Sequence, residues 1–344
     1  MKPPIFTLDQ LTQKTTKMLL LSFLAFALAM LLTPLYTHFA YKYKWWKRHR
    51  STSTTGEALE VIAKLRIKRH IPLMAGLFTL ASITIVTVLW NFDRSQTWLP
   101  LAGLLCGGLV GLIDDIVNIR GIGGSVAGLR APLKFTMITI VAAVGAWFFH
   151  YKLRQVGVIV PFIGMVNVGW MIIPLFILVV VSTGNAVNIS DGMDGLAGGL
   201  LLSAFGAFGI IAALQASFGI AAFCMTIVGA LLSYLWFNIP PARFIMGDVG
   251  SFGLGTSLAV VAMLTNTLFL LPIIGFVFVV EAGSSLIQIA SKRLFHRKVF
   301  IAAPIHHHFE ALGWPKTKVT MRFWVVGQVC AALGVILALI GGYI

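Results

Sequence analysis

The chain has 344 residues, of which 58% are hydrophobic and 11% are charged, and its formal net charge is +15. A soluble domain carries about 25% charged residues, so this composition excludes an ordinary soluble protein. The positive charge could indicate a nucleic-acid partner. The Lys and Arg residues are instead split among short segments between long apolar runs, which is typical of membrane proteins and argues against nucleic acid.

Ten apolar runs predict membrane-spanning helices, each of which needs roughly 20 residues. We expect these helices near residues 18–40, 72–92, 96–117, 134–150, 168–187, 194–214, 217–237, 251–268, 269–290 and 321–343. The stretch 151–167 is short and rich in Gly, Pro and Val, which predicts a small extracytoplasmic β-hairpin. The sequence therefore predicts an all-α integral membrane protein, with residues 1–344 forming a single polytopic domain.

The distribution of basic residues predicts the orientation of these helices. When the spans are threaded alternately, one side receives most of the Lys and Arg residues. The other side receives Lys2, Lys14, Lys17, Arg94, Lys152 and Arg154. Cytoplasmic segments carry an excess of Lys and Arg, so the first side is predicted to be cytoplasmic and both termini extracytoplasmic.

Five of the eleven acidic residues lie in three short motifs at the ends of apolar runs, all on the predicted cytoplasmic side. The motifs are GLIDDIVN with Asp114 and Asp115, NAVNISDGMDG with Asp191 and Asp194, and FIMGDVGS with Asp248. A carboxylate at the edge of a bilayer is costly unless it binds a metal ion or a proton, or pairs with a cation. Mg²⁺ is often held by one or two carboxylates together with phosphate oxygens. We therefore expect one Mg²⁺ site, with Asp248 as the best metal ligand, in a membrane enzyme acting on a phosphorylated substrate.

Each acidic motif also has a structural interpretation. Asp114 and Asp115 could form a solvated helix end, although the helix dipole disfavours carboxylates near a C-terminus. Asp194 and Asp248 could cap the helices that follow them. Turn formation and capping account for one Asp in NAVNISDGMDG, but not for both Asp residues together with two Asn.

The segment APIHHHFEALGW contains three consecutive histidines, His306, His307 and His308. A histidine run could form a zinc site, but zinc ligands usually lie at helical or loop spacing, and no Cys is close in the sequence. Hydrogen bonds to a phosphate or a sugar are therefore favoured. Glu281 lies deep in the ninth predicted span, where it is either functional or a structural hydrogen bond between helices.

Gly103, Gly107 and Gly111 lie four residues apart in the third predicted span. Small residues at this spacing let two membrane helices approach closely. We therefore expect a tight helix–helix contact along this face.

Together, these motifs resemble the phospho-N-acetylmuramoyl-pentapeptide transferase family of the polyprenyl-phosphate sugar-1-phosphate transferase superfamily. The resemblance runs from about Lys68 to Arg322; NAVNISDGMDGLA and MGDVGS are typical of the superfamily, and PIHHHFEALGW and VTMRFW indicate the muramoyl-pentapeptide branch. It implies a ten-helix enzyme of the bacterial cytoplasmic (inner) membrane, often a homodimer. The family reaction transfers phospho-MurNAc-pentapeptide from UDP-MurNAc-pentapeptide to undecaprenyl phosphate with Mg²⁺, giving lipid I and UMP for peptidoglycan synthesis.

The resemblance also assigns roles by position. It implies that Asp248 binds the metal, and the residues expected in catalysis are Asp114, Asp115, Asp248, Lys134 and His306. The expected substrate-binding residues are Lys68, Asn185, Asn188, Asp191, Asp194, His307 and His308.

The chain departs from the family pattern at three places. Residues 71–76 read IPLMAG where the family has TPTMGG, Asn118 replaces a usual lysine, and Ile245, next to Phe244, replaces a Phe placed beside uracil. Nucleotide affinity and sugar specificity are therefore less firmly implied than the reaction class. Three alternatives stay open: a sister transferase using UDP-N-acetylhexosamine without a peptide, a cation or proton transporter, and a catalytically weakened homologue.

Overall fold

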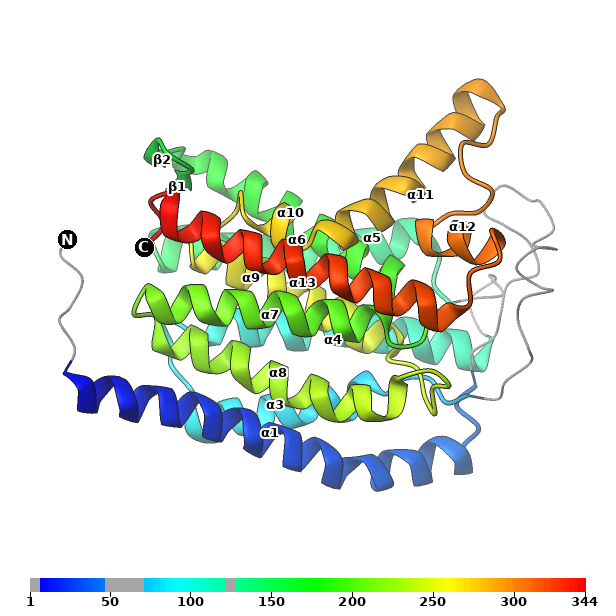
Figure 1. Cartoon of the computed structure of the whole chain (residues 1–344), viewed down its shortest axis with the longest axis horizontal. Helices are drawn as coiled ribbons and strands as arrows, with labels where there is room; N and C mark the ends of the chain where they lie inside the picture. The colour runs from blue at the N-terminus through cyan, green and yellow to red at the C-terminus, as the bar shows by residue number, and fades with distance from the viewer. Residues whose placement is uncertain (1–6, 47–70, 122–127) are drawn as a thin grey trace.

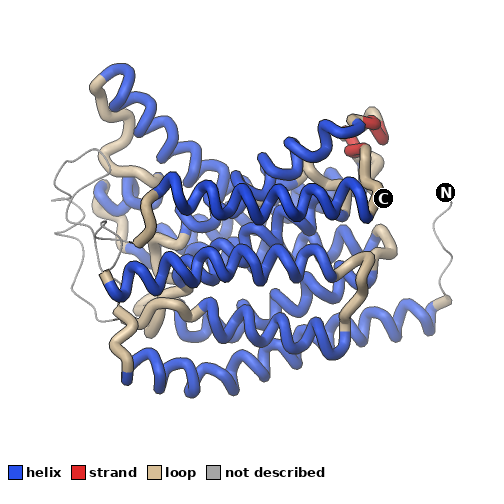
Figure 2. Tube along the Cα trace, turned by 180° about the vertical axis from the view of Figure 1, so that it is seen from behind, coloured by secondary structure: helices blue, strands red, loops and turns tan. Residues whose placement is uncertain are grey.

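The computed structural model describes residues 7–46, 71–121 and 128–344. These residues form a bundle of long helices that run roughly side by side, with a small hairpin at one end (Figures 1 and 2). The long helices are α1 (Leu8–Lys42), α3 (Gly76–Trp90), α4 (Trp98–Arg120), α5 (Ala131–Trp147), α6 (Ile172–Ser190), α7 (Leu196–Leu214), α8 (Phe218–Asn238), α9 (Gly247–Leu264), α11 (Phe276–Phe295) and α13 (Lys316–Ile340). The short helices are α10 (Leu271–Ile274) and α12 (Ile305–Ala311).

Each predicted span corresponds to one of these long helices, so the all-α membrane class is confirmed. Within the described residues, eight helical segments are long and apolar enough to cross a membrane. The other two differ from a simple span. α3 has 15 residues and is about 22 Å long, against roughly 30 Å of hydrocarbon. α11 has 20 residues but carries Lys292 and Arg293 in its last turn.

The ninth predicted span, near 269–290, is interrupted in the structure. α10 ends at Ile274. The N–H of the next residue, Gly275, donates to the carbonyl of Leu271, and α11 begins at Phe276. A Cβ on Gly275 would lie 3.0 Å from that carbonyl oxygen, so glycine permits this tight connection. The break lets α11 lean away from the bundle, as Figure 1 shows.

The predicted hairpin is confirmed as two antiparallel strands, β1 (Gly157–Val160) and β2 (Gly164–Asn167). Val158 pairs with Val166, and the N–H of Phe162 in the turn donates to the carbonyl of Gly341. The hairpin therefore lies against the C-terminal end of the chain. The start of α1, the C-terminus and the hairpin occupy one end of the bundle (Figure 1).

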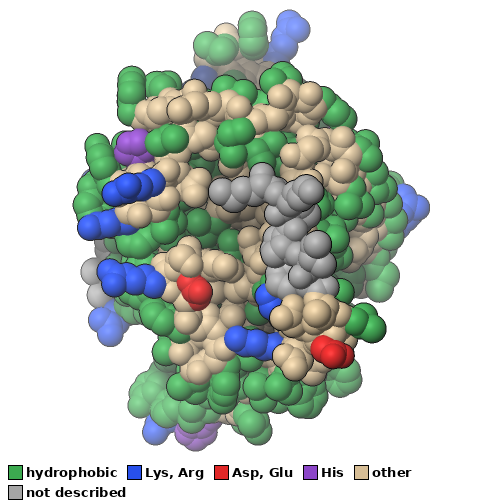
Figure 3. Space-filling model, turned by 90° about the vertical axis from the view of Figure 1, so that its left-hand side faces the viewer, with side chains coloured by type: hydrophobic (Ala, Val, Ile, Leu, Met, Phe, Trp, Pro, Cys, Tyr) green, Lys and Arg blue, Asp and Glu red, His purple; other side chains and the backbone are tan. Residues whose placement is uncertain are grey.

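The two ends of the bundle differ in charge. Figure 3 shows the end that carries the hairpin and the C-terminus, where Lys and Arg side chains and a few acidic ones are scattered among hydrophobic and uncharged side chains. The opposite end carries α12, the loop before it and the C-terminus of α11. These segments contain Lys292, Arg293, Arg297 and Lys298, and Lys316 at the start of α13 lies against α12.

α9 forms the centre of the bundle and packs against α4 and α6. Nearly all of its residues are buried. The contact with α4 is close because α4 presents glycines there. A Cβ on Gly107 would collide with Thr256, and one on Gly111 would collide with the backbone carbonyl of Asp248. The predicted close packing along the glycine face is therefore confirmed, and it fixes the acidic residues of α4 against the start of α9.

Candidate active site

Three carboxylates from two helices meet at the charged end of the bundle. Asp114 and Asp115 belong to α4, and Asp248 belongs to the first turn of α9. Each offers one carboxylate oxygen such that the three lie within 4.8 Å of one another. We call these three residues, with Lys134, the aspartate cluster. Oxygen ligands at this spacing suit a hard divalent cation.

Lys134, near the start of α5, lies between two of these carboxylates. Its Nζ is 2.9 Å from Asp114 Oδ2 and 2.5 Å from Asp248 Oδ2. The side chains of Lys134 and Asp248 are 20% and 17% exposed, so the cluster is open to solvent on one side. The cation offsets part of the cost of placing carboxylates at the edge of a membrane.

Backbone N–H groups orient the pair on α4. Asp114 Oδ1 accepts from the N–H of Leu129 at 2.7 Å, and Asp115 Oδ2 accepts from the N–H of Val249 at 3.0 Å. Asp115 therefore accepts a hydrogen bond from an N–H at the start of α9 that has no acceptor within the helix. The helix dipole also favours a negative charge at this end of a helix. α4 continues to Arg120, and Asp114 and Asp115 are 4% and 2% exposed, so the alternative of a solvated helix end is wrong.

The DGMDG motif is bonded to the loop that precedes α9. Asp191 Oδ2 accepts from the N–H of Gly247, and Asp194 Oδ2 accepts from the N–H of Ala242, both at 3.2 Å. The side chains of the second acidic motif therefore hold the backbone of the loop that leads into the third. Asn238, which the sequence analysis did not single out, supports the same junction: its Oδ1 accepts from the N–H of Gly195 at 2.8 Å. No sequence signal distinguished it from an ordinary polar residue at a helix end.

The two asparagines of the longer motif NAVNISDGMDG, Asn185 and Asn188, lie in the last turns of α6. Asn188 Nδ2 donates to Ser251 Oγ of α9 at 2.9 Å, whereas Asn185 Nδ2 donates to the Val181 carbonyl of its own helix. Their role in substrate binding stays a prediction. The predicted substrate residue Lys68 lies outside the described residues.

The segment that departs from the family pattern supports the loop before Asp248. Ile245 donates to the Pro72 carbonyl and accepts from Ala75, as two adjacent strands would. Phe244 is fully buried, with its ring 5.4 Å from Tyr36 and 5.5 Å from Phe78. Phe244 therefore belongs to the core beneath the loop and offers no open ring to a base.

The three histidines of α12 contact three different partners. His306 Nδ1 lies 2.7 Å from Glu281 Oε2, and His307 Nδ1 lies 3.0 Å from Glu310 Oε2. His308 Nδ1 accepts from the N–H of Ile301. The rings of His306 and His307 lie close together, with centroids 4.2 Å apart, but each ring bonds to a different acid. Among the described residues, the group of acidic and histidine side chains close enough to share a metal ion is the three aspartates, without the histidines, which gives the zinc alternative no support.

Two opposing effects set the charge of Glu310, next to His307. Burial by itself raises the pKa of this carboxyl, but the hydrogen bond from His307 and the charge of Lys316 outweigh it and hold the pKa below its ordinary value of 4.5. The Lys316 Nζ lies 3.6 Å from Glu310 Oε1. Glu310 is therefore a carboxylate at neutral pH and links α12 to the start of α13.

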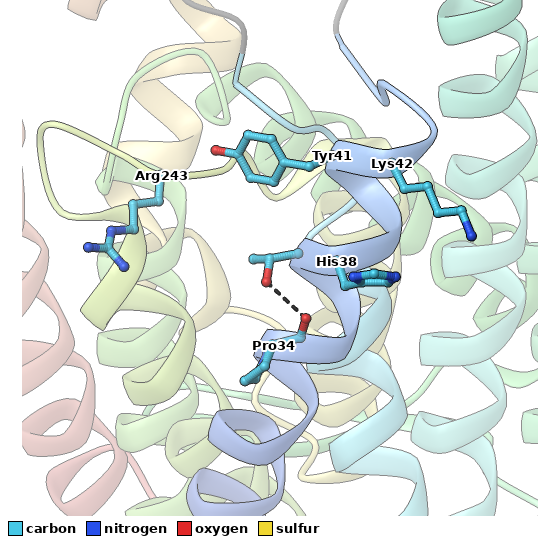
Figure 4. A pocket seen from close by; sticks show the side chains of 6 residues that line it. Pro34, His38, Tyr41, Lys42 and Arg243 are labelled. Carbon is cyan, nitrogen blue, oxygen red and sulfur yellow. Dashed lines mark hydrogen bonds between the residues drawn. The ribbon is translucent and has the colours of Figure 1, made fainter.

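An open pocket beside the C-terminal half of α1 does not have the features of an active site. It is lined by Pro34, Thr37, His38, Tyr41, Lys42 and Arg243. Figure 4 shows the guanidinium of Arg243 and the ammonium of Lys42 pointing in opposite directions on either side of Tyr41. Because its polar groups do not converge, we assign the active site to the aspartate cluster.

The structure shows a carboxylate cluster at the end of a membrane helix bundle. Comparison with known sequences identifies the class of protein to which such a bundle belongs. The family model for glycosyl transferase family 4 matches residues 97–266, which include all four residues of the aspartate cluster. The structure and this match together define a membrane glycosyl transferase.

Individual relatives narrow the class to one family. The phospho-N-acetylmuramoyl-pentapeptide-transferase of Chloroflexus aggregans is 39% identical over 346 residues, covering 96% of this chain and 92% of the relative. The enzyme of that name from Chloroflexus aurantiacus is 38% identical with the same coverage. The one from Lactobacillus acidophilus is 36% identical over 295 residues, covering 84% of this chain and 85% of the relative. The chain therefore belongs to the phospho-N-acetylmuramoyl-pentapeptide-transferase family.

Proposed function

We propose that this protein transfers phospho-MurNAc-pentapeptide from UDP-MurNAc-pentapeptide to undecaprenyl phosphate, which forms lipid I and UMP in peptidoglycan synthesis. The observation that carries the proposal is the identity to enzymes of that name along nearly the whole chain. The aspartate cluster supports it, because it supplies the charges that phosphoryl transfer needs.

The residues of the aspartate cluster fit a resident Mg²⁺ ion. Asp114, Asp115 and Asp248 offer only oxygen ligands, and the partial exposure of Asp248 leaves room for phosphate oxygens and water. A bound Mg²⁺ would supply charge neutralisation to the diphosphate. We assign Asp248 as its principal ligand, because the side chain lies at the open edge and its backbone is fixed by α4.

The protein's own groups then position the two substrates. An oxygen of the lipid phosphate attacks the β-phosphorus of the nucleotide sugar, and the bond to the leaving UMP breaks. Lys134 lies where it can stabilise charge on the transferred phosphate. Asp114, which with Asp248 forms an ion pair to Lys134, is placed to orient the attacking phosphate. This arrangement is compatible with direct transfer or with a covalent intermediate.

We place the aspartate cluster at the cytoplasmic face of the bacterial inner membrane, in a homodimer. The basic end of the bundle supports this orientation. The exposed Thr317 at that end and Ile163, 76% exposed in the hairpin, offer a test by cysteine substitution. In intact cells an impermeant thiol reagent should label Ile163→Cys and leave Thr317→Cys unlabelled. The reverse pattern would contradict the orientation.

The sister transferase is tested by the choice of donor. Purified protein with Mg²⁺ and undecaprenyl phosphate should release UMP from UDP-MurNAc-pentapeptide and much less from UDP-GlcNAc. Preference for UDP-GlcNAc would favour the sister reaction. Release from neither donor would favour the weakened homologue, in which Asn118 and Ile245 are the residues to restore first.

The transporter alternative receives no support from the position of the acids. Transport sites usually lie near the middle of the membrane, between repeated halves of the protein. The aspartate cluster lies instead at one end of the bundle, next to the loops that carry the basic residues.

A further inference from the structure

Two side chains of α13 bond to the turn that the DGMDG motif forms before α7. Thr320 Oγ1 donates to the carbonyl of Asp194, and Trp324 Nε1 donates to the carbonyl of Gly195, both at 3.1 Å. Both donors lie in the VTMRFW segment, to which the proposed function assigns no role. We call these two hydrogen bonds the α13 clasp.

The bond from Thr320 differs from those of other buried threonines in the chain. Thr33, Thr79 and Thr226 each donate to a carbonyl four residues earlier in the same segment of chain. A bond of that kind ties a side chain to its own helix. Thr320 is also buried, but its hydroxyl donates to a different element. It therefore holds α13 and the turn together.

Glycines of the turn and of α7 make room for the indole of Trp324. A Cβ on Gly199 would collide with the indole nitrogen. Gly195 has a φ of +76°, in the left-handed region that favours glycine. The N–H of Gly195 donates to Asn238 Oδ1, while its carbonyl accepts from Trp324. The peptide groups on both sides of this residue are therefore fixed by neighbouring helices.

The same turn braces the loop that leads into α9. Asp194 Oδ2 accepts from a backbone N–H of this loop, and Asp191 Oδ2 accepts from the N–H of Gly247. Gly247 precedes Asp248 and has a φ of +78°. A Cβ on Gly247 would lie 2.5 Å from Asp115 Oδ2, so the backbone here fits closely against the aspartate cluster. A shift of the turn would therefore reach Asp248.

We propose that Thr320 and Trp324 are positioning residues for the metal site: they hold the DGMDG turn, which fixes the loop before α9 and with it the orientation of Asp248. This inference rests on the proposed function, which makes Asp248 a metal ligand. α13 also carries Lys316, which pairs with Glu310 of α12. One helix thus supports both the aspartate cluster and the segment that bears the three histidines.

Three substitutions separate the donated hydrogen from the shape of the side chain. Thr320→Val keeps the shape but removes the hydroxyl, and Thr320→Ser keeps the hydroxyl but removes the methyl group. Trp324→Phe keeps an aromatic ring without the N–H. Thr226→Val on α8 is the control, because it removes an equally buried hydroxyl whose bond stays within its own helix.

Binding of Mn²⁺ to the full-length protein without substrates gives a readout that does not depend on turnover. Mn²⁺ takes the same kinds of oxygen ligand as Mg²⁺, and free Mn²⁺ can be measured by electron paramagnetic resonance. Thr320→Val and Trp324→Phe should each weaken Mn²⁺ binding about three- to tenfold, the effect expected for one hydrogen bond. Thr320→Ser and Thr226→Val should stay within about twofold of wild type. Loss of binding in Asp248→Asn identifies the site.

Kinetics and melting complete the test. The Mg²⁺ concentration for half-maximal UMP release should rise in parallel with the Mn²⁺ dissociation constant, while Thr320→Val and Thr226→Val should have similar melting temperatures. Wild type that binds no Mn²⁺, equal Mn²⁺ affinity in Thr320→Val and Thr320→Ser, or equal weakening in Thr226→Val would overturn the positioning role. If the clasp variants weaken Mn²⁺ binding but the wild type releases no UMP, the proposed function fails while the positioning inference stands.

Discussion

The aspartate cluster and the histidine segment (His306, His307 and His308) are built in opposite ways. In the cluster, Lys134 and Asp248 keep part of their surface exposed, and one cation is shared by two carboxylates. In the histidine segment, Glu281 and His306 form one fully buried pair. An open group of charges can exchange internal ion pairs for a metal and a phosphate, whereas a buried pair can only hold a ring in place. We infer that the cluster carries the chemistry and the histidine segment positions the donor.

The two regions also differ in what supports them. The aspartate cluster lies on α4, α5 and α9, and α9 is the most enclosed helix of the bundle. The histidine segment lies on α12, which rests on α11 where that helix leaves the bundle (Figure 1). Changes in the cluster should therefore affect turnover most strongly, and changes in the histidine segment should affect donor binding.

The largest effect is expected for Asp248→Asn. Removing this charge weakens the metal site at its open edge while keeping the side-chain shape. Metal-based charge stabilisation contributes several kcal/mol, so UMP release should fall about a thousandfold or more. The variant should remain extractable as folded protein. Near-normal turnover at saturating Mg²⁺ would remove Asp248 from the metal site and erase the contrast between the two regions.

Gly111→Ala tests whether helix packing fixes the cluster. The added Cβ would collide with the Asp248 carbonyl, so α4 and α9 must separate, at a cost of about 1–3 kcal/mol in stability. Turnover should fall together with the melting temperature. Gly206→Ala on α7 is the control, because a Cβ there meets nothing within 4 Å. Equal melting temperatures for the two variants would show that the close contact does not hold the site together.

Alanine variants of the three histidines should have intermediate effects, mainly on KM for the UDP-linked donor. Loss of a hydrogen bond to a charged group costs about 1.5–3 kcal/mol, or about ten- to a hundredfold. His306→Ala should be the most impaired because it also leaves Glu281 buried without its partner. Full activity in all three variants, or stoichiometric zinc in the purified protein, would defeat a donor-positioning role.

The smallest effect is expected for Glu310→Gln, and it should depend on pH. The pKa of Glu310 in the folded protein lies below its ordinary value of 4.5, so the ionised form stabilises the fold. This stabilisation is fully present above that ordinary value and is lost as pH falls through the lowered pKa. Wild type should therefore melt above Glu310→Gln at pH 7, by about 1 kcal/mol or less in stability, and the gap should close in acid. A gap that widens below pH 4.5 would contradict the assigned ion pair.

Much of the architecture could be predicted because the bilayer imposes a simple length rule on apolar runs. Each predicted span has its helix, and the Gly107 and Gly111 contact with α9 followed from their spacing. The break at Gly275 could not be predicted, because the apolar run continues through it. Hydropathy records burial in lipid or protein alike and carries no signal for a turn made by one glycine.

The acidic residues of the site could be predicted from the sequence, but the hydrogen bonds that connect their segments could not. The sequence indicated that the three acidic motifs converge, and the structure brings Asp114, Asp115 and Asp248 together. The sequence did not indicate that Asp115 accepts a hydrogen bond from the start of α9, or that Asp191 and Asp194 accept hydrogen bonds from the loop before α9. Glu281 was left between a functional and a structural role, because its partner His306 is 25 residues away. Such pairings depend on how helices pack, which a single sequence does not encode locally.

The metal dependence of UMP release is the decisive measurement for phosphoryl transfer at a carboxylate-held Mg²⁺. Purified protein would be stripped with a chelator, mixed with undecaprenyl phosphate and UDP-MurNAc-pentapeptide, and titrated with Mg²⁺. We expect no UMP without Mg²⁺, restored release when Mg²⁺ is added, and no restoration in Asp248→Asn. Undiminished UMP release from the stripped enzyme, or equal Mg²⁺ rescue of Asp248→Asn, would contradict this mechanism.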